Sequence, residues 1–247
     1  MSSTAIGCGM SSTPCASSWG KMDFKMSEST DIHPLTSTRH IVADTCRAYG
    51  RSAHEYAAAT RDYDAYPGLR EEIVAFEGKL PHGRPVLDLG CGGGRDSRLL
   101  AGLRRRVIAG DICLPMLTSA RELSACYGAA VDYTCLDMLA LPFSDGALGG
   151  IWASGSMLHL PSTEIARGLS EVLRTLSAGG VAAISMRAGD REGWREGGTL
   201  QGRRWFTHVQ PGEFAASMIA AGFGDVQTRF SGRPGWFVAV GYNKSTA

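Results

Sequence analysis

The segment "VLDLGCGGGRDS", residues 86–97, decides the fold of this chain of 247 residues. An apolar run from Val86 to Leu89 ends in glycines at alternate positions, and a helix-like stretch follows. This order predicts a buried strand, a tight glycine turn and the start of a helix. Glycine permits the positive φ angles of such a turn and lets a ligand approach the backbone closely. The turn alone is a weak signal, so its ligand must be inferred from the residues around it.

The composition excludes several classes of partner. At 44% hydrophobic and 20% charged residues, the chain is an ordinary globular protein that can bury a sizeable core. Its net charge of +1 creates no global basic field that would gather nucleic acid or anionic membrane. No apolar stretch approaches the ~20 residues of a membrane span. We therefore expect neither a nucleic-acid partner nor a membrane.

The cysteines indicate the cellular compartment. They are seven in number and scattered, with no CxxC pair and no Cys/His spacing typical of zinc. This pattern argues against both a metal site and a disulfide framework, and free thiols fit a reducing environment. The sequence thus predicts a cytoplasmic protein without a metal.

Strand-like and helix-like segments alternate through most of the chain. Strands are expected at residues 85–89, 106–111, 131–135, 149–154, 181–187, 225–230 and 235–242, and helices at 95–103, 114–128, 162–176 and 211–223. Ser162 and Thr163 are candidate N-caps, and Gly179-Gly180 is expected to end that helix. Such alternation predicts an α/β fold with a doubly wound, mostly parallel sheet.

The domain organisation follows from the same pattern. Residues 1–38 are rich in Ser and Thr and lack the apolar core of a signal peptide, so we expect a flexible or loosely attached tail. Residues 39–247 are expected to form one domain. Within it, residues 39–80 would be a helical cap and residues 81–247 a Rossmann-like core.

Acidic residues at the strand ends discriminate between ligands. In such a sheet the ligand lies outside the carboxyl ends of the strands, where Asp88, Asp111 and Asp137 are expected. Asp111 follows Gly90 by 21 residues, a distance that suits the ribose of either NAD or S-adenosylmethionine. Asp88 and Asp137 would repel a pyrophosphate but attract an ammonium and a sulfonium. They therefore favour S-adenosylmethionine.

Four segments in order resemble the motifs of the class I S-adenosylmethionine-dependent methyltransferases of the bacterial small-molecule type. They are "VLDLGCGGGRDS", "AGDICLPMLTSAR", "LDMLALPFSDG" and "LRTLSAGGVAAIS", and the likeness covers roughly residues 50–242. It implies a seven-stranded, mostly parallel sheet with an antiparallel last strand and helical additions at the N-terminus. Two departures from the family pattern are Leu148-Gly149, where Phe-Asp is usual, and Cys113, where Ser is commoner.

The resemblance also implies roles for individual residues. Asp88 and the glycine turn would hold the methionine end of the cofactor, Asp111 the ribose, and Asp137 the adenine amine, with Ile112 and Met138 against the adenine. Asp88 bracing the loop and Met116 packing in the core are the structural alternatives. The full expected cofactor set is Asp88, Gly90, Cys91, Gly92, Gly94, Arg95, Asp111, Ile112, Met116, Asp137, Met138, Ala153, Ser154 and Tyr63.

Methyl transfer from a sulfonium is an in-line displacement that depends mostly on positioning and on exclusion of water. The stretch "ASGSMLHLP" replaces the Asn/Asp-Pro-Pro-aromatic motif of nucleic-acid amino-methyltransferases, which favours a small-molecule acceptor methylated on O, N or C. We expect Tyr56, Tyr63 or Tyr66 to roof the acceptor pocket, and residues 187–206 to form a second wall.

His159 is the candidate catalytic residue. An imidazole titrating near neutrality could take a proton from the acceptor, and the alternative is a structural bond to a backbone carbonyl. Two other functions stay open, an NAD-dependent oxidoreductase and a protein that binds S-adenosylmethionine without methylating. The acceptor and the oligomeric state are also open, with a homo-oligomer among the alternatives.

Overall fold

The computed structural model describes residues 37–197 and 200–244. The tail expected at residues 1–38 lies almost wholly outside the described residues, so that prediction stays untested. The described helices are α1 (Thr38–Arg51), α2 (Ala53–Ala59), α3 (Leu69–Glu77), α4 (Arg95–Gly102), α5 (Leu114–Cys126), the short 3-10 helix η1 (Met157–His159), α6 (Ser162–Thr175) and α7 (Pro211–Ala221). The described strands are β1 (Val86–Leu89), β2 (Val107–Asp111), β3 (Asp132–Cys135), β4 (Leu148–Ser154), β5 (Leu176–Arg187), β6 (Glu192–Arg195), β7 (Arg204–Thr207), β8 (Phe223–Phe230) and β9 (Trp236–Asn243).

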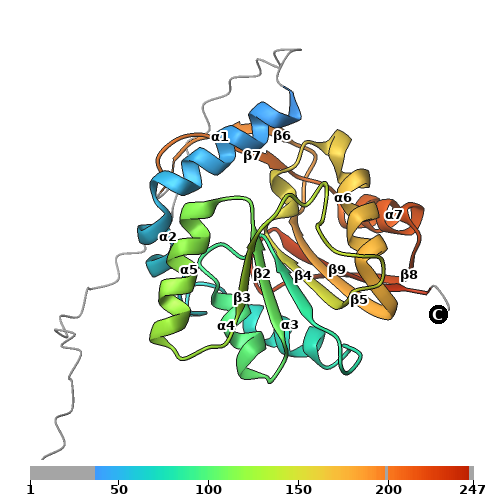
Figure 1. Cartoon of the computed structure of the whole chain (residues 1–247). Helices are drawn as coiled ribbons and strands as arrows, with labels where there is room; N and C mark the ends of the chain where they lie inside the picture. Colours follow the sequence, from blue (N-terminus) through green and yellow to red (C-terminus); the bar gives the residue numbers. More distant parts are fainter. Residues whose placement is uncertain (1–36, 198–199, 245–247) are drawn as a thin grey trace, which may run out of the picture. The chain divides into compact units, whose positions relative to one another are not determined.

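Seven strands form the central sheet, in the order β3-β2-β1-β4-β5-β9-β8 (Figure 1). The pairs among β1 to β5 are parallel, whereas β9 runs antiparallel to both β5 and β8. This arrangement confirms the predicted doubly wound α/β fold with an antiparallel last strand. The carboxyl ends of β1, β2 and β4 consequently meet at one edge of the sheet.

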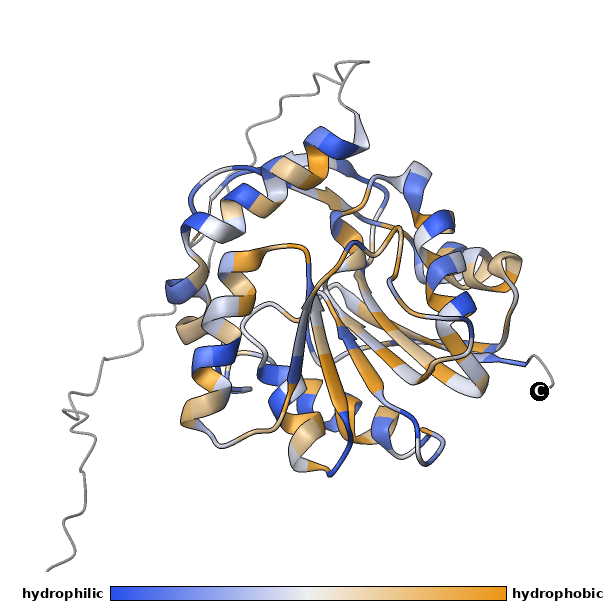
Figure 2. Ribbon diagram, viewed as in Figure 1, coloured by the Kyte–Doolittle hydropathy of each residue, from blue (hydrophilic) through white to orange (hydrophobic). Residues whose placement is uncertain are grey.

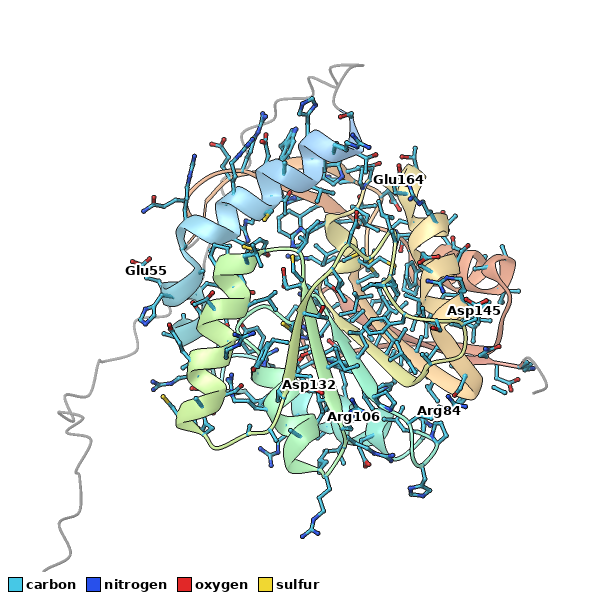
Figure 3. All side chains as sticks on the ribbon, in the orientation of Figure 1. Glu55, Arg84, Arg106, Asp132, Asp145 and Glu164 are labelled. Atoms are coloured by element: carbon cyan, nitrogen blue, oxygen red, sulfur yellow. The ribbon has the colours of Figure 1, made fainter. Side chains whose placement is uncertain are left out.

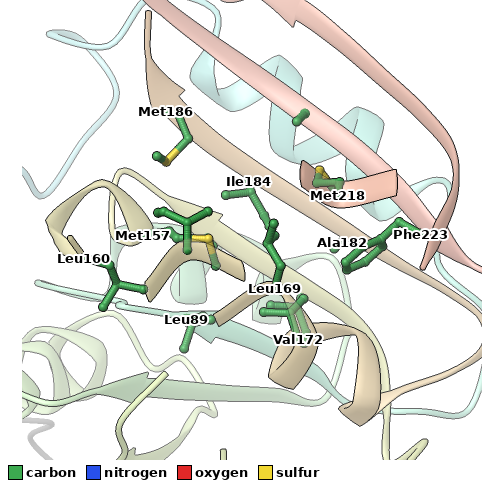
Figure 4. Packing of buried hydrophobic residues seen from close by; sticks show 14 of the residues in the cluster. Leu89, Met157, Leu160, Leu169, Val172, Ala182, Ile184, Met186, Met218 and Phe223 are labelled. Carbon is green, nitrogen blue, oxygen red and sulfur yellow. The ribbon is translucent and has the colours of Figure 1, made fainter. Parts of the chain in front are cut away.

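The central strands β1 and β4 are buried on both faces, as strands in parallel sheets usually are. Along β4, Ile151 lies in the hydrophobic cluster that includes Leu169 of α6, and Trp152 lies in the cluster on the opposite face. Figure 4 shows the first of these clusters, with Leu169 and Val172 packed against the strands. Figure 2 shows that hydrophobic residues concentrate on the strands, while the helices carry polar residues outward.

Only part of the expected helical cap covers the edge of the sheet. Helix α1 contacts α5 and β7, and α2 contacts α5, at the end of the molecule where the glycine turn lies (Figure 1). Helix α3 instead packs on a face of the sheet, where the Phe76 and Trp152 rings are 5.4 Å apart. The structure therefore differs from a cap of residues 39–80, because the apolar face of α3 is buried against the core.

Two boundaries differ from the prediction. Strand β5 begins at Leu176, directly after α6 ends, so Gly179-Gly180 lies inside the strand and does not end the helix. The early start is stabilised by pairing with Leu148 and by Asn243, whose side-chain nitrogen donates to the Leu176 carbonyl at 2.7 Å. The N-cap of α6 is Pro161, and Ser162 instead donates from its Oγ to the Glu192 carboxylate at 2.6 Å.

The segment expected to form a second wall of the acceptor pocket, residues 187–206, contains a hairpin. Strands β6 and β7 pair antiparallel, and Trp194 faces Trp205 edge-on at 5.3 Å. Glycine and arginine are frequent in this segment, which hid the alternation of a strand. The hairpin lies beside α1, so it does stand at the carboxyl edge of the sheet (Figure 1).

Candidate functional site

The glycine turn is fixed to the neighbouring strand by backbone bonds. Gly90 and Cys91 both donate their N–H to the Gly110 carbonyl of β2, at 2.7 and 3.0 Å. Gly90, Gly92 and Gly94 all have positive φ, and Gly94 is the N-cap of α4. The turn therefore presents its backbone at the carboxyl edge of the sheet, as the sequence predicts.

Asp111 connects this turn with the loop that follows β2. Its Oδ2 accepts from the Gly92 N–H at 3.0 Å, and its Oδ1 accepts from the Cys113 N–H at 2.9 Å. Burial raises the pKa of the Asp111 carboxyl, although these backbone donors oppose the rise. Ile112 beside it is an exposed apolar side chain. The carboxylate is thus held in place at the centre of the candidate site.

Asp88 is buried and faces α4. Its Oδ2 accepts from Ser97 Oγ at 2.5 Å, which is the contact of a residue that braces the turn. Burial raises the pKa of Asp88 to about 7, the nearby Asp96 adds to the rise, and the Ser97 bond opposes it. Its role toward the methionine end of a cofactor stays a prediction.

The Asp88→Asn variant is expected to flatten the pH dependence of stability. The pKa of Asp88 is about 7 in the folded state and about 3.8 in the unfolded state. Between these two pH values the folded chain therefore binds a proton that the unfolded chain does not. Wild-type stability should fall as the pH rises through this window, by up to about 1.4 kcal/mol for each pH unit. Asn keeps an acceptor for Ser97 and cannot ionise. Urea unfolding at several pH values measures the effect, and Asp132→Asn is the control. Identical slopes for Asp88→Asn and wild type would contradict it.

Sequence reasoning missed Asp96. This buried carboxylate accepts from Trp152 Nε1 at 2.9 Å, from the Tyr63 hydroxyl at 3.1 Å and from Arg95 Nε at 2.7 Å. The Arg95 guanidinium also stacks on Tyr63 and on Tyr66, with 4.9 and 4.3 Å to the ring centres. An acid in the first turn of the helix after a glycine turn was the available signal. Asp96 therefore positions both Tyr63 and Arg95 beside the turn.

Helices α1 and α2 bring aromatic side chains over the glycine turn. A Cβ on Gly92 would lie 3.6 Å from Met116 Cε and 3.8 Å from Tyr56 Cε1. The Tyr56 ring meets Tyr49 edge-on at 5.3 Å. Met116 is buried and packs with Cys113, so its core contacts are established while its cofactor contact stays a prediction. Tyr49 was not expected from the sequence.

The remaining predicted residues lie around this centre. Asp137 is exposed and accepts from the Leu139 N–H at 2.9 Å, and the neighbouring Met138 is half-buried against the core. Ala153 is fully buried, Ser154 is half-buried at the end of β4, and Cys91 packs in a small cluster beneath the turn. Ala153 and Cys91 therefore offer mainly backbone at the edge, while Asp137 offers a carboxylate.

His159 joins three elements. Its Nδ1 donates to the Trp205 carbonyl of β7 at 2.6 Å, and its Nε2 accepts from the Tyr49 hydroxyl of α1 at 2.9 Å. Burial lowers its pKa to about 4, the Trp205 bond opposes this, and Arg204 lowers it further. The lowered pKa disfavours the charged imidazole near neutrality, and the bond to the Trp205 carbonyl is the structural alternative. The catalytic role of His159 stays a prediction. These contacts are those of a positioning residue.

His159→Ala is expected to destabilise the protein by about 1–3 kcal/mol, because two hydrogen bonds are lost. Since the pKa is lowered in the folded state, the wild-type contribution is complete above about pH 6.5 and is lost as the pH falls toward 4. Thermal unfolding between pH 4 and 8 measures both effects, and Tyr49→Phe, which removes one bond, should lose less. A turnover per folded molecule reduced by ~10²-fold would instead identify a general base.

Within the described part of the chain, the helices are all too short or too polar to cross a membrane. The same residues contain no group of three or more His, Cys, Asp or Glu side chains that could hold a metal ion.

Residues 86–180 match the family model of a methyltransferase domain. The malonyl-acyl-carrier-protein O-methyltransferase of Pseudescherichia vulneris is 30% identical over 139 residues, which cover 55% of this chain and 53% of that protein. The chain thus matches over about half the length of this curated relative.

Solved structures share the fold. The 1,6-didemethyltoxoflavin-N1-methyltransferase of Burkholderia thailandensis, with bound S-adenosylhomocysteine, has a TM-score of 0.69 and 22% identity, covering 86% of this chain and 92% of its own. The cyclase SpnF has a TM-score of 0.63 and 15% identity, covering 85% of this chain and 97% of its own. Residues 86–180 therefore match a methyltransferase domain, within a chain that has the fold of these solved structures.

Proposed function

We propose that this protein binds S-adenosylmethionine and transfers its methyl group to a small-molecule acceptor. The observation that carries the proposal is the Asp111 carboxylate, held by two backbone N–H groups beside a glycine turn. A carboxylate at the end of the second strand suits the hydroxyls of a ribose. The bound S-adenosylhomocysteine of the toxoflavin enzyme supports the same ligand for this chain.

The residues around the glycine turn fit S-adenosylmethionine. Gly92 leaves room under Tyr56 and Met116 that a larger side chain would reduce, and the backbone of the turn can approach a ligand closely. Asp111 would bind the ribose, Ile112 offers an exposed apolar side chain for the adenine, and Asp137 an exposed carboxylate for its amine. Asp88 would act on the methionine end, through the turn that it braces.

The bound cofactor supplies an activated methyl group, so the protein has mainly to position the acceptor and exclude water. Tyr49 and Tyr56 would cover the site on the side of α1 and α2. His159 connects Tyr49 with the hairpin of β6 and β7 through its two hydrogen bonds. With its lowered pKa, His159 is neutral at physiological pH and acts by holding these elements together.

The proposal includes the class of acceptor and the cellular compartment. A net charge of +1 creates no overall basic field that would gather nucleic acid, so a free small molecule is the favoured acceptor. The toxoflavin enzyme, which shares the fold, was solved with a small-molecule ligand. We place the protein in the cytoplasm, on the ground of its scattered cysteines, of which those in the described residues are free.

Two alternatives remain distinct. An NAD-dependent oxidoreductase would use the same turn and Asp111, but Asp88 beside the turn and the exposed Asp137 disfavour a pyrophosphate. A protein that binds the cofactor without methylating is the second alternative, and SpnF, named as a cyclase, has this fold.

Calorimetry with S-adenosylhomocysteine and with NAD, side by side on the full chain, tests the cofactor. We expect binding of the first only, and binding of NAD alone would overturn the proposal. Incubation with S-adenosylmethionine and a panel of small acceptors, read by the mass gain of one methyl group, tests the transfer. Binding without transfer to any acceptor would favour the non-methylating alternative.

A further inference from the structure

Trp236 brings the antiparallel end of the sheet next to the candidate site. It is the first residue of β9 and pairs with Arg187, the last residue of β5. A Cβ on Gly155 would lie 3.1 Å from Cη2 of the Trp236 ring. Gly155 directly follows Ser154, the end of β4 and a predicted cofactor residue. Groups around Trp236 are therefore neighbours of the cofactor site.

A cavity of about 250 Å³ opens beside this ring. It is lined by Ala65, Tyr66, Pro67, Arg233, Pro234 and Trp236. Tyr66 also stacks on Arg95, which follows the glycine turn directly. The cavity thus combines two aromatic rings with one cation, and one of its walls contacts the proposed cofactor site.

Arg233 is a buried cation with unmade hydrogen bonds. The residue is only 8% exposed, and its guanidinium lies 4.5 Å from the centre of the Trp236 ring. Its Nε and Nη2 have no hydrogen-bond partner, and the nearest carboxylate oxygen, Glu72 Oε2, is 3.7 Å from Nη2. Buried polar groups normally have partners, and an unsatisfied guanidinium is costly. Both nitrogens are closed to solvent, so a ligand in the cavity would interact with the charge of the guanidinium and not with these two atoms.

Glu72 does not supply that partner. Both of its carboxylate oxygens are buried without a hydrogen bond, and burial raises its pKa, although Arg233 and Arg229 oppose the rise. A carboxyl with a raised pKa carries its negative charge less readily. The positive charge of Arg233 is therefore incompletely balanced from within the protein.

A second guanidinium approaches Trp236 from β5. Arg187 lies 5.6 Å from the centre of the ring, and its buried Nε has no hydrogen-bond partner. Arg187 lies near further positive charges. Burial and the charges of Arg195, Arg187 and Arg191 together lower the pKa of His208 to about 4. The region around Trp236 consequently favours negative charge.

We propose that this cavity binds the methyl acceptor and that the acceptor is a planar organic anion. Its negative group, a carboxylate in the simplest case, would pair with the positive charge of Arg233, which lines the cavity. Its planar part would lie against Tyr66 and Trp236. The identification of the ligand as a methyl acceptor rests on the proposed function, but binding of an anion in this cavity can be tested without it.

Benzoate and benzamide, which differ in charge and not in shape, are the probes. We expect the full chain, with S-adenosylhomocysteine present, to bind benzoate and to bind benzamide roughly tenfold more weakly, as for loss of one charge-assisted bond. Ligand-observed NMR titration measures both. Arg233→Gln should weaken benzoate binding by a similar factor, and Arg233→Lys should recover part of it. Arg106→Gln, at the opposite end of the strands (Figure 3), should leave it unchanged.

A double variant that removes both Glu72 and Arg233 charges separates loss of binding from loss of folding. Arg233→Gln alone leaves Glu72 buried without its cation, whereas Glu72→Gln combined with Arg233→Gln removes both charges. We expect the double variant to keep wild-type thermal stability and still to lose benzoate binding. No measurable benzoate binding to wild type, equal binding of both probes, or unchanged benzoate binding in the double variant would each overturn the proposal.

The two proposals fail separately. If S-adenosylhomocysteine does not bind but benzoate binding depends on Arg233, the anion site stands and the methyl-transfer proposal fails. If S-adenosylhomocysteine binds and the probes do not distinguish charge, the cofactor assignment stands and the anion site fails. Acceptor screens with matched pairs of an acid and its amide should then find transfer to the acids, and transfer to the amides alone would overturn the assignment of the acceptor.

Discussion

Gly90→Ala is expected to lower the free energy of unfolding by about 2–5 kcal/mol and to abolish cofactor binding. A Cβ at this position would lie 2.2 Å from Cβ of Ser156, a separation that no relaxed structure contains. Ser156 cannot withdraw easily, because its Oγ donates to the Leu89 carbonyl at 2.6 Å. Overpacking costs about 1–3 kcal/mol. The φ of 73° adds about 1–2 kcal/mol for any residue with a Cβ.

Gly83→Ala is the matched control for this variant. Gly83 has a φ of 80°, and a Cβ there would meet nothing within 4 Å. It should therefore lose only the conformational part, about 1–2 kcal/mol, and keep cofactor affinity. Urea unfolding and calorimetry with S-adenosylhomocysteine compare the two variants. Equal losses of stability would show that the contact with Ser156 is relieved and would contradict the prediction.

Asp111→Ala is expected to reduce affinity for S-adenosylhomocysteine by roughly tenfold or more. The variant would lack the charge-assisted hydrogen bonds between the Asp111 carboxylate and the ribose, each of about 1.5–3 kcal/mol. It would also leave the N–H groups of Gly92 and Cys113 without their present acceptor. Asp111→Asn keeps an acceptor oxygen without the charge and should lose less. Calorimetry on folded protein measures all three.

The pH dependence of binding provides a second readout for Asp111. Because burial raises its pKa, the carboxylate gains its proton at a higher pH than an exposed Asp, and affinity should fall as the pH is lowered through that pKa. Asp111→Asn should abolish this dependence. Asp132→Ala, at the opposite end of the strands (Figure 3), is the control for loss of an acid. Unchanged affinity in a folded Asp111→Ala protein would refute the assignment.

The order of elements could be predicted because it depends on neighbours along the chain. The run from Val86 to Leu89, the glycine turn and the helix from Arg95 each carry their own local preference, and the alternation of such units predicts a doubly wound sheet. The position of Asp111 at the end of β2, opposite the turn, follows from the same order. Parallel strands then bring these residues together at one edge without further information.

Contacts between residues far apart in sequence were decided only by the tertiary structure. The bond of Trp152 to Asp96 and the bonds of His159 to Tyr49 and to Trp205 join segments that show no common pattern in the sequence. The lowered pKa of His159 follows from burial by those distant segments. The same holds for Arg233, whose cavity exists because the loop before β9 folds against the segment before α3. Local sequence determines what each segment can form, whereas burial and charge at a site depend on which distant segments pack around it.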